Sequence, residues 1–180
     1  MKAGILRSKK LILRPIKLKD SEIIVKIATK NVSKYFGVIP YPYKIEDAKK
    51  WIRSSWHIKD SIDFAITLKD TNDFLGYIEI NGINKKSKTG CISYWIGEKY
   101  WRKGYMSEAM SLILDNVFKI KALNKIYAQV NGKNIASQML LKKLGFKLEG
   151  TLRSQIFNKY TKELDDKLFY GLFRAEWETH

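Results

Sequence analysis

The segment from residue 91 to residue 120 joins an apolar run, a glycine-bearing turn and an amphipathic run without interruption. The run from Cys91 to Ile96 is strand-like and ends at Gly97, and the turn that contains Gly104 follows closely. Apolar residues then recur at helical spacing, at Ala109, Leu112, Ile113, Val117 and Ile120. A strand that turns directly into a helix indicates a domain of mixed α and β structure.

The turn itself has the chemistry of an anion site. The first N–H groups of a helix lack intrahelical acceptors, and the positive end of the helix dipole lies behind them. Gly104 would let a phosphate approach the backbone closely, and Arg102 and Lys103 add positive charge. A plain capped turn fits the same residues, so the turn alone leaves both interpretations open.

The other segments alternate between strand and helix patterns with no linker and no repeat, which predicts a single domain over residues 1–180. The predicted strands are Leu11–Ile16, Phe64–Leu68, Tyr77–Ile80, Ile126–Val130, Phe146–Phe157 and Leu168–Phe173. The predicted helices follow Asp20-Ser21 and span Ile45–Ile58 and Ile135–Leu144.

The net charge and the hydropathy of the chain favour some classes of function and exclude others. The chain has 34 Lys and Arg against 18 Asp and Glu, a net charge of +16. This balance favours polyanionic partners and allows a weak association with nucleic acid or ribosomes, although scattered lysine pairs equally fit a biased genome. No apolar run approaches the roughly 18 residues of a membrane span, and a single cysteine excludes an internal disulfide. We expect a cytoplasmic protein with no membrane association.

Two motifs together resemble one protein family. The string YWIGEKYWRKGYMSEA, around Gly104, is similar to the acyl-CoA-binding turn of the GNAT superfamily of N-acyltransferases, and to its RimJ/RimL-like branch of ribosomal-protein N-terminal acetyltransferases. Trp101 and Met106 depart from the strict superfamily pattern at its two ends. The second motif runs from Asn134 through Ser137 to Gly145-Phe146 and resembles the helix that follows in that family.

The resemblance implies a fold and a cofactor. The fold is an α/β/α sandwich of the α+β class, with a mixed, mostly antiparallel sheet of about seven strands and about four helices. Acetyl-CoA, as co-substrate, would enter between two splayed parallel strands, Cys91–Ile96 and Ile126–Val130. The implied cofactor-binding residues are Trp95, Ile96, Arg102, Lys103, Gly104, Tyr105, Met106, Ser107, Asn134, Ser137 and Lys143.

The same resemblance suggests catalytic roles. Ser137 occupies the place of a serine proposed in the RimL-like branch to protonate the CoA thiolate, and its alternative role is that of a small residue that lets CoA pack closely. Glu79 is the candidate base for the amine, with Glu149, Asp166 or a water chain as alternatives. Cys91 lacks a paired histidine and is expected to be a small buried residue. No Cys/His cluster has metal spacing, so no metal is expected.

The expected reaction is direct transfer of an acetyl group from acetyl-CoA to a primary amine, and the favoured acceptor is the N-terminus of a protein or peptide. A small amine such as an aminoglycoside, a polyamine or an amino-acid-like compound is the alternative, and the positive charge disfavours polyamines. Non-enzymatic modules that bind nucleic acid or CoA remain the other class. The acceptor is expected near the segments Tyr35–Tyr43 and Arg153–Lys162, with candidate aromatic contacts from Tyr35, Phe36, Trp51, Trp56 and Tyr160. Both a monomer and a homodimer fit the sequence.

Overall fold

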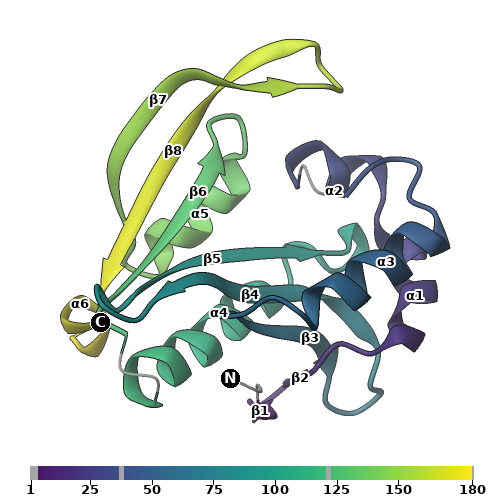
Figure 1. Cartoon of the computed structure of the whole chain (residues 1–180), viewed down its shortest axis with the longest axis horizontal. Coiled ribbons are helices and arrows are strands. Elements are labelled where there is room, and N and C mark those ends of the chain that lie inside the picture. The colour runs from purple at the N-terminus through teal and green to yellow at the C-terminus, as the bar shows by residue number, and fades with distance from the viewer. Residues whose placement is uncertain (1–3, 37–38, 121–122, 180) are drawn as a thin grey trace.

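The computed structural model describes residues 4–36, 39–120 and 123–179. In that part of the chain, one sheet of eight strands is covered by helices (Figure 1). The strands are β1 Leu6–Arg7, β2 Leu11–Arg14, β3 Ile62–Leu68, β4 Phe74–Asn84, β5 Thr89–Ile96, β6 Lys125–Asn131, β7 Lys147–Asn158 and β8 Glu163–Phe173. The α-helices are α1 Ser21–Ile27, α2 Lys30–Tyr35, α3 Ile45–Ser55, α4 Tyr105–Asp115, α5 Ile135–Lys143 and α6 Arg174–Glu178. Short helical turns cover Leu18–Asp20, Glu98–Tyr100 and Asn116–Ile120, the last of them a π-helical turn.

The strand order in the sheet is β1-β2-β3-β4-β5-β6-β8-β7. Every neighbouring pair is antiparallel except β5 and β6, which are parallel. This parallel pair ends early, and β6 then diverges from β5 together with the β7–β8 hairpin (Figure 1). The predicted fold class, a mixed and mostly antiparallel sheet with a splayed parallel pair, is therefore confirmed.

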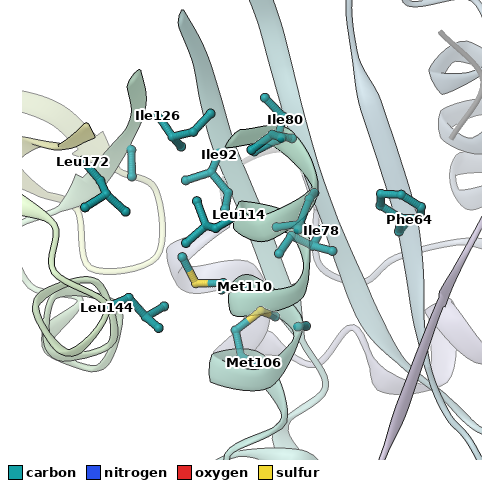
Figure 2. Close-up of a cluster of buried hydrophobic side chains, with 14 of the residues drawn as sticks. Phe64, Ile78, Ile80, Ile92, Met106, Met110, Leu114, Ile126, Leu144 and Leu172 are labelled. Carbon is teal, nitrogen blue, oxygen red and sulfur yellow. The ribbon is translucent and has the colours of Figure 1, made fainter. Parts of the chain in front are cut away.

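Alternating side chains of the central strands build a core on each face of the sheet. Ile78, Ile80 and Ile92 face α4 and α5, where they meet Met110 and Leu144 (Figure 2). Full burial of each such side chain contributes about 1.5–3 kcal/mol, so this layer holds α4 and α5 firmly against the sheet. The intervening residues, which include Ala65, Tyr77 and Trp95, face the opposite way and pack against α1, α2 and α3.

Several element boundaries differ from those predicted from the sequence. The short strand β1 and the short helices α2 and α6 bring the described totals to eight strands and six α-helices. Helix α2, which Thr29 caps by accepting a hydrogen bond from the Val32 N–H at 3.4 Å, extends as far as Tyr35, the first residue of the aromatic segment Tyr35–Tyr43 that the sequence predicts as a loop between two helices. Gly37 and Val38 of the predicted loop lie outside the described residues.

Strand β8 begins at Glu163, five residues before the predicted start. Its polar first half pairs with β7 as a solvent-exposed hairpin, where the apolar alternation used for prediction is absent. Strand β8 lies inside the sheet between β6 and β7, so β7 forms the edge. A dimer formed by extension of the sheet would therefore use β7 rather than β8.

Candidate functional site

The two parallel strands separate at a defined register position. Strands β5 and β6 pair at Thr89 with Lys125, Gly90 with Ile126, and Cys91 with Tyr127, and no later pair forms between them. Both strands nevertheless continue, β5 to Ile96 and β6 to Asn131. The unpaired continuations leave backbone N–H and C=O groups that an extended ligand arm could bind.

The turn before α4 is shaped by two left-handed residues. Gly104 has φ +79° and Arg102 has φ +59°, and Gly104 immediately precedes the first residue of α4. A Cβ added to Gly104 would contact nothing within 4 Å, so the glycine is required by its backbone angle and not by crowding. The first intrahelical bond runs from the Glu108 N–H to the Gly104 carbonyl at 3.1 Å. The N–H groups of Tyr105, Met106 and Ser107 therefore have no intrahelical acceptor and point outward from the helix start.

Met106 does not obstruct this turn, despite its departure from the family pattern. Its side chain is 8% exposed and points into the core beside Met110 (Figure 2). Only its backbone faces the turn, so the larger side chain leaves the space in front of α4 open. Arg102 and Lys103 are both exposed next to that space.

The second motif places a hydroxyl pair at the split between the strands. Asn134 caps α5, since its side-chain oxygen accepts a hydrogen bond from the Ser137 N–H at 3.1 Å. The Ser137 hydroxyl then lies 2.7 Å from the hydroxyl of Tyr94 on β5. Burial raises the pKa of Tyr94 to about 12, although the Ser137 hydrogen bond opposes that rise. Tyr94 is thus a protonated hydrogen-bonding group at neutral pH, and it joins α5 to β5 beyond the last parallel pair.

Sequence reasoning did not identify Tyr94. The available signal was its position, because Tyr94 alternates with Trp95 and therefore faces the α4 and α5 side of the sheet, where Ser137 lies.

The other residues expected to bind the cofactor lie around this region. The Trp95 side chain is buried on the opposite side of the sheet from Tyr94. The carbonyl of Ile96 accepts a hydrogen bond from the Trp101 indole at 2.9 Å. Lys143 is exposed in the last turn of α5, at the end of the helix opposite Asn134.

Glu79 lies on β4, on the face that Trp95 shares. Its carboxylate accepts hydrogen bonds from the Tyr77 hydroxyl at 3.0 Å and from the Asn81 amide at 2.8 Å. The same Asn81 amide also donates to the Ser93 hydroxyl at 3.2 Å. These contacts connect Glu79 to Ser93, which lies directly across from it on β5.

A second carboxyl, which sequence reasoning also missed, lies opposite Glu79. Asp63 on β3 is in register with Glu79 on β4. Burial and, to a smaller extent, the charge of Glu79 together raise the pKa of Asp63 to about 6. The signal in the sequence was an acidic residue inside the apolar strand Ile62–Leu68. The two carboxyls form an acidic patch behind Asn81.

The other candidate reactive groups lie in different surroundings. Burial, together with the charge of Glu79, raises the pKa of the Cys91 thiol to about 11, so this thiol is not a nucleophile at neutral pH. Glu149 pairs with Lys125 at 2.7 Å. Asp166 accepts a hydrogen bond from the Ser154 N–H at 2.8 Å within the β7–β8 hairpin. Neither of these carboxylates belongs to the acidic patch.

A cavity of about 570 Å³ lies on the same face of the sheet as Glu79. Its walls come from α2, the ends of β5 and β6, and the tip of the β7–β8 hairpin, which arches toward α2 (Figure 1). Asn81 and Ser93 reach it from the central strands. Hydrogen bonds hold the tip in place, because the buried carboxylate of Asp165 accepts from Asn131 at 2.8 Å.

The predicted acceptor segments are brought together at this cavity, but the predicted aromatic set is not. Tyr35 and Tyr160 line it. Trp51 instead packs edge-on against Tyr77 with ring centroids 4.7 Å apart, and Trp56 is 54% exposed at the end of α3. Phe36 is partly buried against the core on the α1–α3 face. Helical spacing could not separate these positions from true cavity positions.

Two absences apply to the described residues. No group of three or more His, Cys, Asp or Glu side chains is arranged there to hold a metal ion. No helix among them is both long enough and apolar enough to cross a membrane.

Comparison with known proteins gives consistent matches over most of the chain. Two relatives are the "Uncharacterized N-acetyltransferase p20" of Bacillus licheniformis and the "Uncharacterized N-acetyltransferase YoaA" of Bacillus subtilis. The first is 28% identical and covers 96% of this chain and 97% of its own length. The second is 32% identical and covers 87% of this chain and 90% of its own length.

A solved structure agrees with the sequence matches. The crystal structure of a GNAT-family acetyltransferase from Bacillus anthracis has a TM-score of 0.83 at 25% identity, over 96% of this chain and 100% of that one. The family model described as "Acetyltransferase (GNAT) domain" matches residues 10–147, which include the splayed strands, the Gly104 turn and Ser137. The chain therefore belongs to the GNAT family of acetyltransferases.

Proposed function

We propose that this N-acetyltransferase binds acetyl-CoA between β5 and β6 and transfers the acetyl group to the N-terminal amine of a protein or peptide. The observation that carries the proposal is the end of the parallel pairing at Cys91 and Tyr127, directly beside the Tyr94–Ser137 hydroxyl pair. The pantetheine arm would pair with the free edge of β5, near Trp95 and Ile96. The pyrophosphate would lie against the backbone from Arg102 to Ser107.

The remaining residues expected to bind the cofactor have supporting roles in this proposal. Asn134 fixes the start of α5 and so holds Ser137 in place, while Lys143 at the far end of α5 offers charge to the outer part of the cofactor. No step of the proposed chemistry requires a metal.

The reaction is a direct displacement in a ternary complex. The neutral amine attacks the thioester carbon, the carbon–nitrogen bond forms, and negative charge develops on the carbonyl oxygen. The carbon–sulfur bond then breaks, and the thiolate of CoA takes a proton from the Ser137 hydroxyl. Tyr94, whose raised pKa keeps it protonated before the reaction, is the proposed donor that returns a proton to Ser137, and Tyr94 regains its own proton from water when the products leave.

Glu79 is the proposed base that receives the ammonium proton from the acceptor. Its hydrogen bonds with Tyr77 and Asn81 fix its carboxylate next to Asn81, which lines the cavity. A water molecule would carry the proton from the amine past Asn81 to Glu79, since Glu79 itself does not line the cavity. If the acidic limb of the pH–rate profile persists in Glu79→Gln, the base is another group or a water chain.

Two kinds of acceptor are supported by relatives with named substrates. The Bacillus subtilis relative YdaF, which carries a ribosomal N-acetyltransferase name, is 21% identical over 171 residues and supports a protein N-terminus of the RimJ/RimL type. The spermidine N(1)-acetyltransferase of Escherichia coli is 25% identical over 170 residues and makes a polyamine the second candidate. The described lining of the cavity favours the first, because its charged residues are all lysines.

The deciding experiment is an acetylation assay with acetyl-CoA and a panel of amines. The panel contains N-terminal peptides, spermidine and an aminoglycoside, and products are identified by mass spectrometry alongside release of free CoA thiol. Acetylated peptide N-termini are expected, whereas exclusive turnover of spermidine would replace the proposal with the polyamine alternative. Calorimetry with CoA separately tests cofactor binding, and CoA binding without any turnover would indicate a sensor. The single domain, the cytoplasmic location, the oligomeric state and any ribosome association stay predictions.

A further inference from the structure

The described residues that line the acceptor cavity carry positive charge and no negative charge. Three lysines, Lys34, Lys159 and Lys167, line it, and no Asp or Glu does. They come from three separate elements: α2, the turn after β7, and β8. Their convergence therefore depends on the fold, since no run of basic sequence produces it.

Each of these lysines packs over an aromatic ring and lacks an acidic partner. Lys34 lies over Tyr35 with Nζ 5.1 Å from the ring centroid, Lys159 lies over Tyr160 at the same distance, and Lys167 lies over Phe169 at 5.7 Å. Among the described residues, none of the three makes an ion pair. This is unlike Lys125 and Lys133, which are neutralised by Glu149 and by Asp165. The cavity lysines thus remain available to an incoming anion.

The described carboxylates near the cavity all lie outside its lining. Asp165 accepts hydrogen bonds from the lining residues Asn131 and Asn158, but its charge is paired with Lys133.

Glu79 lies beside the lining residues Asn81 and Ser93 without lining the cavity itself, and Asp63 is in register with Glu79 on β3. We call the surface that Asn81 and Ser93 form the floor of the cavity, and the three lysines its rim. The rim is positively charged, and the acidic residues Glu79 and Asp63 lie behind the floor. An amine would be drawn toward the floor, next to the split strands, while an anionic group on the same molecule would be held at the rim.

We infer that the acceptor is a peptide N-terminus with an acidic side chain at its second or third position. This inference rests on the proposed function and specifies its substrate class. The sheet order places β6 between β5 and β8, so Ser93 and Lys167 lie at least two strand spacings apart, about 10 Å. An extended peptide covers this minimum distance in about three residues, so the second and third positions are the nearest to the N-terminus from which an acidic side chain, with its own length added, reaches the lysines.

The same composition disfavours a polyamine acceptor. Spermidine would bring additional ammonium groups into a cavity whose charged lining residues are all lysines. Like charges at this range repel, and none of the described lining residues supplies a carboxylate to offset that repulsion.

The test compares three pentapeptides that start with Ser and carry a fluorophore at the C-terminus. One has Asp and Glu at its second and third positions, one has Asn and Gln there, and one has two Lys there. Binding is measured by anisotropy with CoA present, and turnover is measured with acetyl-CoA. The acidic peptide is expected to bind about tenfold more tightly than the amide peptide and to show a similar advantage in kcat/KM. Added salt should reduce both advantages.

Two triple variants isolate the cause. Lys34→Gln, Lys159→Gln and Lys167→Gln together should reduce the preference for the acidic peptide to within about twofold. The control changes the exposed lysines Lys9, Lys26 and Lys86 to Gln, which alters the net charge equally away from the cavity and should keep the preference. A folded cavity variant that retains the preference, or a wild type that binds all three peptides equally, overturns the inference.

The two readouts separate this inference from the proposed function. Turnover of all peptides without a charge preference supports peptide acetylation and overturns the acidic specificity. Tight binding of the acidic peptide without acetylation supports the specificity and overturns the proposed reaction. A protein that neither binds nor acetylates any peptide overturns both.

Discussion

The hydroxyl of Tyr94 is the residue-scale feature that links the sheet to the chemistry of α5. It lies 2.7 Å from the Ser137 hydroxyl, and both groups project from elements that meet only beyond the last parallel pair. If Tyr94 returns a proton to Ser137, its loss slows the step in which the carbon–sulfur bond breaks. The contacts that bind CoA are unchanged, so the affinity for CoA is unaffected. The two residues should therefore act as one unit.

Removal of the Tyr94 hydroxyl is predicted to slow turnover selectively. In Tyr94→Phe we expect kcat to fall by about tenfold while the affinity for CoA, measured by calorimetry, changes by less than about twofold. In the double variant with Ser137→Ala the loss should be close to that of Ser137→Ala alone, because the pair shares one function. Tyr127→Phe, which removes a hydroxyl from the neighbouring strand, is the matched control. Fully additive losses in kcat would show that Tyr94 and Ser137 act independently.

Asp63 is predicted to make stability depend on pH in the direction opposite to that of a typical carboxylate. Its pKa rises from 3.8 to about 6 on folding, because of burial and the charge of Glu79. Below pH about 4 the carboxyl is protonated in both the folded and the unfolded state, so it does not lower the free energy of unfolding. As pH rises from about 4 to about 6 the unfolded state ionises first, so stability falls, and the full cost persists above pH 6.

The variant Asp63→Asn should therefore have a higher Tm than the wild type at pH 7.5 and a nearly equal Tm at pH 4. Thermal unfolding followed by circular dichroism at both values measures the difference. Asp70→Asn, in the exposed turn between β3 and β4, controls for the loss of one charge. An Asp63→Asn variant that is less stable at pH 7.5 would mean that the carboxylate is stabilised by its surroundings.

At the scale of elements, the turn before α4 combines conformational strain with the start of a helix. Arg102 and Gly104 both adopt left-handed backbone angles, and only the glycine does so without steric cost. The conformation directs the first N–H groups of α4 to one side of the turn. A change at Gly104 should thus affect both stability and cofactor binding.

Gly104→Ala is predicted to lower the free energy of unfolding by about 1 kcal/mol and to weaken CoA binding. Gly150→Ala is the matched control, since an added methyl group there also meets nothing within 4 Å but no left-handed angle is involved. Urea denaturation and calorimetry with CoA give the two quantities. Equal behaviour of the two alanine variants would exclude a specific role for the Gly104 backbone.

The elements also show what the sequence could and could not predict. The long strands, α4 and α5 followed from periodicity and from two motifs whose glycine and asparagine have local backbone reasons. The split between β5 and β6 followed only from the family resemblance that those motifs carry. The boundaries of β8 and the existence of α2 did not, because the first is decided by pairing with β7 and the second by a Thr29 cap. Local patterns indicate the strand face of Tyr94 and the unusual position of Asp63, but their partners Ser137 and Glu79, like the convergence of the three cavity lysines, depend on contacts between distant segments.

At the scale of the whole molecule, the residues proposed to bind the cofactor and those proposed to bind the acceptor lie on opposite faces of the sheet. The α4 and α5 face holds the Gly104 turn and Ser137, while the opposite face holds Glu79, and the acceptor cavity opens on that side. In the proposed mechanism, the split between β5 and β6 connects the two faces. An acetyl group carried through the split would meet an amine that enters from the other side, so the two substrates need not compete for one surface.

The net charge of +16 should make salt act in opposite directions on stability and on substrate affinity. Self-repulsion among unpaired lysines destabilises the compact state, so raising the ionic strength from about 0.02 M to about 0.3 M is predicted to raise Tm. The same salt screens the attraction between the cavity lysines and an acidic peptide, so KM for that peptide should rise. Sodium chloride and potassium chloride should give equal effects, because the mechanism is screening and not binding of a specific ion. A Tm that falls with salt would indicate that favourable ion pairs, such as Lys133 with Asp165, outweigh the repulsion.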